Sequence, residues 1–209
     1  MKIMTSRQII ELLIFFMFIF NGCSQNEKSL KYNDFKKRIL PEVFTKFPIK
    51  ENKDISKCLT MAIEFPDAYE YLGYCGMSLV YEYELTSFTD ALKLLETKNI
   101  GVYSDKDSCL LLIDDSTILD CHQSNIKYYP IYNFYSSSST LNKDVLAKKN
   151  LKYYVIDCKE GRYLRSYDFE GKPNILPQQF LSQTYKHGFS NGTTVDFDKH
   201  RIVYWLLIW

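Results

Sequence analysis

The sequence predicts a single α+β domain in which three or four helices pack on a mainly antiparallel sheet. Two segments, 32–47 and 87–98, carry apolar side chains at the three- and four-residue spacing of one helical face. After Gly101 the chain breaks into short strand-like runs separated by turn residues. The last residues, Ile202 to Trp209, form an apolar run without alternation, which is typical of a strand covered on both faces. We therefore expect this buried C-terminal strand in the centre of the sheet.

The first helix is expected over residues 32–47. The apolar side chains on its face are Tyr32, Phe35, Ile39, Leu40, Val43, Phe44 and Phe47. Pro41 either kinks this helix or starts its second half, because proline has no amide proton to donate inside a helix. Phe47 and Pro48 end it.

The second helix is expected over residues 87–98. Ser87 can accept a hydrogen bond from the first turn as a cap, and Asp90 carries the negative charge that a helix N-terminus favours. Asn99 and Gly101 are placed to end the helix.

Strands are expected from the remaining runs rich in aromatic and β-branched residues, at 69–85, 102–103, 110–113, 118–119, 126–134, 151–159 and 193–197. Residues 55–65 fit a helix or a strand. Gly161 is expected to supply the turn of a hairpin between 151–159 and 162–167. Further helices are expected at 141–149 and 177–188.

The N-terminus has the pattern of a secretory signal. Lys2 and Arg7 precede the unbroken apolar run Leu12 to Phe20, and a small residue, Gly22, lies before Cys23. The apolar run is much shorter than the roughly 20 residues that a membrane-spanning helix needs. We therefore expect export of the protein without a transmembrane helix.

The segment Phe20-Asn21-Gly22-Cys23 resembles the lipobox of bacterial lipoproteins, although Phe20 and Asn21 depart from its commonest residues. The resemblance covers about the first 23 residues and implies that residues 1–22 are a cleaved signal peptide. It also implies that Cys23 carries several acyl chains, which together anchor a protein stably in a membrane. The expected location is the bacterial envelope, at the outer membrane. Alternatively, the chain is a secreted protein whose Cys23 is unmodified.

Residues 23–34 are polar after the cysteine and are expected to form a tether, which leaves 35–209 as one globular domain. The chain has 26 lysines and arginines against 25 aspartates and glutamates. This balance gives no basic face, so nucleic acid is not an expected partner.

The five cysteines after Cys23 leave at least one thiol unpaired if disulfides form. Cys109 and Cys121 flank two short predicted strands and are the pair that a disulfide would join. Alternatively, all five are buried thiols that pack as small apolar groups. The sequence has no C-x-x-C motif and only three histidines, so we expect neither a metal site nor a cofactor.

Residues 188–192, Gly-Phe-Ser-Asn-Gly, match the G-x-S-x-G pattern of the serine-hydrolase nucleophile elbow. An elbow joins a strand to a following helix, whereas the predicted order here is helix, motif, strand. The candidate partners Asp196, Asp198, His187 and His200 lie only a few residues from Ser190, and Asp198 and His200 lie beside a hairpin turn. We interpret the motif as a turn, and catalysis by Ser190 as a remote alternative.

Tyrosine is abundant, with 17 residues, and it clusters in residues 128–135. The members of this cluster are Tyr128, Tyr129, Tyr132 and Tyr135. Exposed tyrosines offer large contact areas with polar tips, so this segment is a candidate surface for a glycan or a protein. Alternatively, these rings pack across strands of the sheet.

These observations predict a membrane-anchored envelope protein that is a non-enzymatic binding or interaction module. Its expected partners are the membrane, through Cys23, and an envelope protein or glycan. An immunity or inhibitor lipoprotein that neutralises a toxin or hydrolase fits the size and neutral charge equally well.

Overall fold

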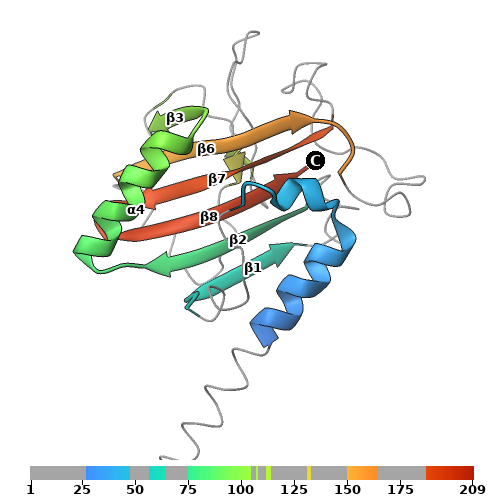
Figure 1. Ribbon diagram of the computed structural model, residues 1–209, viewed down its shortest axis with the longest axis horizontal. Coiled ribbons are helices and arrows are strands. Elements are labelled where there is room, and N and C mark those ends of the chain that lie inside the picture. The colour runs from blue at the N-terminus through green and yellow to red at the C-terminus, as the bar shows by residue number, and fades with distance from the viewer. Residues whose placement is uncertain are drawn as a thin grey trace, which may run out of the picture.

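The computed structural model describes residues 27–47, 57–64, 75–104, 107, 112–113, 131–132, 150–163 and 187–209. Its centre is a six-stranded antiparallel sheet with the strand order β1-β2-β8-β7-β6-β3 (Figure 1). The strands are β1 (Thr60–Glu64), β2 (Cys75–Glu82), β3 (Gly101–Ser104), β6 (Leu151–Glu160), β7 (Gly188–Asp196) and β8 (Arg201–Ile208). Helices packed on an antiparallel sheet confirm the predicted α+β class.

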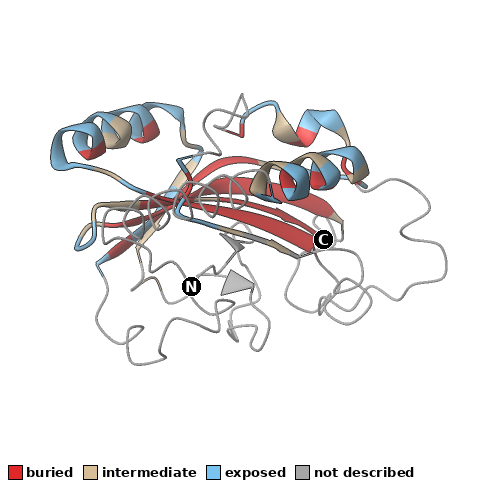
Figure 2. Ribbon diagram, turned by 90° about the horizontal axis from the view of Figure 1, so that it is seen from below, coloured by how far each residue is buried: buried red, intermediate tan, exposed pale blue. Residues whose placement is uncertain are grey.

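Both helices lie on the same face of the sheet (Figure 2). They are the helix at 27–38, which continues into the short 3₁₀ helix η1 (Pro41–Phe44), and α4 (Leu85–Lys98). A parallel pair of two-residue strands, β4 (Leu112–Ile113) and β5 (Ile131–Tyr132), forms a second sheet, and β5 contacts β7 and β8. The described residues thus contain two α-helices, where the sequence predicted three or four in the whole chain.

The first helix starts earlier than the sequence predicted. It is already helical at residue 27, where the described residues start, so most of the segment expected to be a tether is helical. Tyr32 and Phe35 are buried in the hydrophobic core, which draws this end of the chain onto the sheet. Pro41 takes the first position of η1, where its missing amide proton costs nothing. Of the tether expected over 23–34, residues 27–34 are therefore helical, because Tyr32 packs into the core, and residues 23–26 lie outside the described residues.

Helix α4 also begins earlier, at Leu85, and Ser87 is not its cap. Glu84 occupies the N-cap position without a side-chain hydrogen bond. At the other end, Asn99 stops the helix as expected. Its Nδ2 donates to the carbonyl oxygens of Leu95 and Glu96, at 2.8 and 3.1 Å, and satisfies two acceptors of the last turn.

Strand β8 lies between β2 and β7, which confirms the predicted central C-terminal strand. The adjacent β8 residues Trp205 and Leu206 point to opposite faces of the sheet, and both are fully buried. Trp209 extends the ladder: its backbone N–H and C=O each bond to Gly188, at 3.1 Å. The end of the chain is therefore part of the core.

Residues 162 and 163, the described part of the segment predicted to form a hairpin with β6, do not pair with that strand. Its antiparallel partners are β7 along its whole length and β3 over Lys152 to Val155. Gly161 turns the chain at a positive φ of 135°, but Arg162 and Tyr163 after it are not in a strand. Residues 164–167 lie outside the described residues.

Two hydrophobic clusters fill the space between the sheet and the helices. One lies under the first helix and η1 and includes Phe35, Val43 and Leu79. The other lies under α4 and includes Phe88, Leu95, Tyr154, Ile156, Val195 and Ile202. Tyr83 and Tyr204 are half-buried and pack against both clusters. The boundary between the two clusters lies between α4 on one side and the first helix with η1 on the other.

Candidate functional site: a groove between the two helices

The sequence predicted a turn at the motif. The structure instead places the motif residue Ser190 within strand β7. It pairs with Cys158 on one side and Leu207 on the other, and it is fully buried. A nucleophile elbow exposes its serine at a sharp strand-to-helix bend. Because Ser190 lies within a continuous strand, the motif does not have this geometry.

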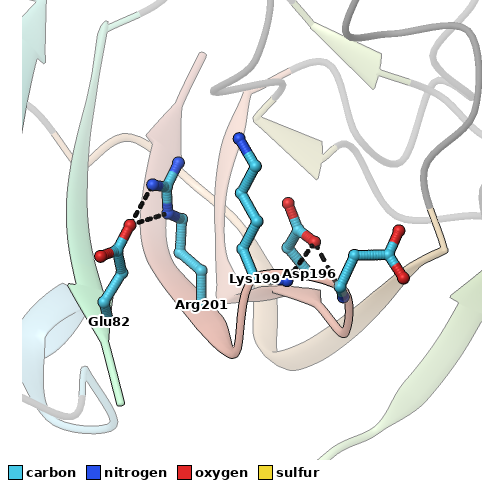
Figure 3. A network of polar contacts seen from close by, with 5 residues as sticks. Glu82, Asp196, Lys199 and Arg201 are labelled. Carbon is cyan, nitrogen blue, oxygen red and sulfur yellow. Dashed lines mark hydrogen bonds and ion pairs between the residues drawn. The ribbon is translucent and has the colours of Figure 1, made fainter. Parts of the chain in front are cut away.

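The candidate catalytic partners are also distant from Ser190. Asp196 lies six residues further along the same strand, about 20 Å away at roughly 3.3 Å per residue. Its Oδ1 accepts hydrogen bonds from the backbone N–H groups of Asp198 and Lys199, at 3.1 and 3.2 Å, and so closes the β7–β8 turn (Figure 3). His200 completes that turn with a positive φ of 48°.

The two glycines of the motif make room for tryptophan rings. A Cβ at Gly192 would lie 2.6 Å from the Trp205 ring and 2.2 Å from the carbonyl oxygen of Tyr154. A Cβ at Gly188 would lie 2.8 Å from the Trp209 ring. All three distances are too short for a contact of a Cβ atom. The G-x-x-x-G spacing therefore reflects close packing in the sheet, because strand residues four apart share a face.

The described cysteines Cys58, Cys75 and Cys158 are thiols that take part in no disulfide. Burial, with a smaller contribution from Asp157, raises the pKa of Cys158 to about 12. This thiol is therefore protonated at neutral pH and is a weak nucleophile. Cys58 and Cys75 belong to the hydrophobic core under the first helix. This agrees with the alternative that the five cysteines after Cys23 are buried thiols, for these two residues.

Most of the site residues predicted from the sequence lie outside the described residues. These are Cys23, Cys109, Cys121, Tyr128, Tyr129 and Tyr135. Tyr132 forms part of β5, paired with Ile113.

Other described residues line a groove of about 590 Å³ on the helix-covered side of the sheet. One wall is the turn after η1, and the other is α4 with the start of the following segment. Ile156 and Tyr204 come from the sheet beneath. The lining residues are Thr45, Lys46, Phe47, Ala91, Leu94, Leu95, Lys98, Ile100, Ile156 and Tyr204. This volume lies within the range of small-molecule sites, which are mostly apolar with a few polar groups.

Two lysines supply the charge of the groove. Lys46 Nζ lies 3.4 Å from Asp157 Oδ2, and the aspartate side chain is only 10% exposed. Lys98, in the last turn of α4, is exposed and forms no ion pair with another described residue. The hydroxyl of Tyr204 shares a hydrogen bond of 3.1 Å with that of Tyr83.

Polar side chains continue beneath the groove, within the sheet. Asn191 pairs with Asp157 across the ladder, and its Nδ2 donates to the carbonyl oxygen of Val43, at 3.3 Å. Thr193 pairs with Tyr204 and is fully buried. Asn191 Oδ1 and Thr193 Oγ1 have no hydrogen-bond partner among the described residues. The face of the sheet between the two helices is therefore more polar than the clusters on either side.

Sequence reasoning missed this groove because its lining comes from four distant segments. The only local signal is on α4, where Leu94 is 53% exposed beside the buried Leu95. Single exposed apolar side chains are common on protein surfaces, so Leu94 by itself does not predict a groove.

No helix among the described residues has the length and hydropathy to cross a membrane. Nor do three or more histidine, cysteine, aspartate or glutamate side chains gather into a metal-binding group in that part of the chain. Comparisons with protein-family models, curated proteins and solved structures give no match to this chain.

Proposed function

We propose that this chain is a lipid-anchored binding protein of a bacterial envelope, and that the groove between η1 and α4 is its ligand site. The groove carries the proposal: it is a formed, mostly apolar recess with a lysine in each wall and Tyr204 from the sheet beneath. The sequence around Cys23 supports the lipid anchor.

The chemistry of the lining supports binding rather than catalysis. Its polar groups are two lysines, a threonine and the Tyr204 hydroxyl. Lys46 is held in an ion pair, and Tyr204 is hydrogen-bonded to Tyr83. Ser190 and Cys158 are not among the lining residues. Such groups orient a ligand by charge and hydrogen bonds.

Intact mass spectrometry of the protein extracted from its native membranes tests the anchor. We expect the mature chain to begin at Cys23 and to carry acyl chains. Cys58→Ser is the matched control and should keep this mass increment. A mature chain with an unmodified Cys23, or cleavage elsewhere, would contradict the anchor.

Crosslinking in the native envelope, followed by capture of the protein, tests the groove. Ala91→Phe places a ring in the groove, whereas Thr89→Phe places the same ring on an exposed position of α4. We expect Ala91→Phe to lose the captured molecule and Thr89→Phe to keep it, with equal melting temperatures. Equal capture by both variants would show that the groove is not the site.

A further inference from the structure

We infer that the ligand of the groove is a single-chain amphiphile with a monoanionic head group, such as an alkyl carboxylate. This inference rests on the proposed function of the groove and adds the chemical class of its ligand. Three properties of the lining lead to it: its net charge, its exposed apolar surface and its dimensions.

Among the described residues, the groove has one positive charge without an ion-pair partner. Asp157 neutralises Lys46 at 3.4 Å, whereas Lys98 forms no ion pair with another described residue. The Asn99 side chain occupies two carbonyl groups of the last turn of α4, so fewer free carbonyls remain there to repel an anion. A ligand with one negative charge therefore complements this end of the groove.

The remaining surface favours an alkyl chain. Leu94 and Ile100 are 53% and 48% exposed, although both are large apolar side chains that line the groove. Phe47, Leu95 and Ile156 are buried and lie deeper. An alkyl chain laid against these residues removes exposed apolar surface from water without leaving polar groups unpaired.

The dimensions favour a linear molecule over a protein segment. The α4 wall runs from Ala91 to Lys98, about 10 Å at 1.5 Å per residue. A partner helix is about 10–12 Å across with its side chains, whereas a single alkyl chain needs much less room between the two walls. A single chain fits with its head group at Lys98 and its tail toward Ala91 and Phe47.

Photolabelling of the full chain in a neutral detergent tests the inference. The probe is decanoate with a diazirine on the chain, and the matched probe is the corresponding decanol. We expect label on peptides that contain Ala91 to Ile100 and Thr45 to Phe47. We also expect the carboxylate to bind about fivefold more tightly than the alcohol, as an exposed ion pair implies. Unlabelled alkyl carboxylates should compete about fourfold better with each added methylene until the groove is filled.

Lys98→Met keeps the apolar stem of the side chain and removes its charge. It should abolish the preference for carboxylate, whereas Lys93→Met, an exposed lysine on the same helix that does not line the groove, should preserve it. Equal labelling by both probes, a preference that survives Lys98→Met, or label outside these peptides would overturn the inference. If decanoate fails but Ala91→Phe still loses a partner captured from the envelope, the binding function stands and only this ligand class is wrong.

Discussion

Replacement of Gly192 by alanine tests whether the G-x-S-x-G motif serves packing. The new Cβ would lie 2.2 Å from the carbonyl oxygen of Tyr154 and 2.6 Å from the Trp205 ring. Without these contacts, glycine-to-alanine in a strand stabilises a protein by about 0.4–1 kcal/mol, because the unfolded chain loses freedom. A decrease in the free energy of unfolding would therefore indicate that the new Cβ clashes, and an increase would indicate that it has room.

The magnitude follows from the rigidity of the neighbours. Overpacking costs about 1–3 kcal/mol, and the upper value applies here because the carbonyl is held in the β6–β7 ladder and cannot rotate away. At about 2–4 °C per kcal/mol for a chain of this size, we expect Gly192→Ala to melt about 6–12 °C below the wild type. Thermal unfolding followed by tryptophan fluorescence measures this.

Two further variants serve as controls. In Gly101→Ala the nearest atom, at 2.9 Å, is the hydroxyl end of the half-exposed Tyr103 side chain, so we expect little change. In a Trp205→Phe background, Gly192→Ala should cost about 1 kcal/mol less, because the ring contact is relieved while the carbonyl contact stays. A melting temperature of Gly192→Ala equal to or above that of the wild type would refute the packing explanation.

Three other outcomes are expected. Deletion of the last three residues, ending with Trp209, should abolish cooperative unfolding in circular dichroism, because Trp209 is buried and bonded to Gly188; a normal transition would contradict this. Asp196→Ala should lower the urea-unfolding free energy by about 2 kcal/mol through lost bonds to the β7–β8 turn, and Asp196→Asn, which keeps an acceptor, by less. Because folding raises the pKa of Cys158 from 9.0 to about 12, its contribution to stability should be complete below about pH 9 and decline toward pH 12. Cys158→Ala should show a smaller alkaline loss of stability, and an unchanged pH profile would contradict this.

The sequence predicted the fold correctly where a local pattern and the tertiary packing agree. The apolar run of β8 predicted a central strand, and the spacing of Phe88 and Leu95 predicted the buried face of α4. The errors lie where local chemistry and packing disagree. Gly188 and Gly192 are turn formers in isolation, yet both lie in β7 because two tryptophan rings of the C-terminal segment need the space.

The sequence by itself determined the α+β class, the central C-terminal strand and the end of α4 at Asn99. Each depends on side chains close together in the chain, so periodicity and end signals report them directly. Only the tertiary structure decided that Ser190 is buried far from Asp196, and that Lys46, Lys98 and Ile156 line one groove. The first depends on β7 running straight through the motif, and the second joins residues from different strands and helices. Their distances are set by sheet order and by how the helices cover the sheet, which no local pattern contains.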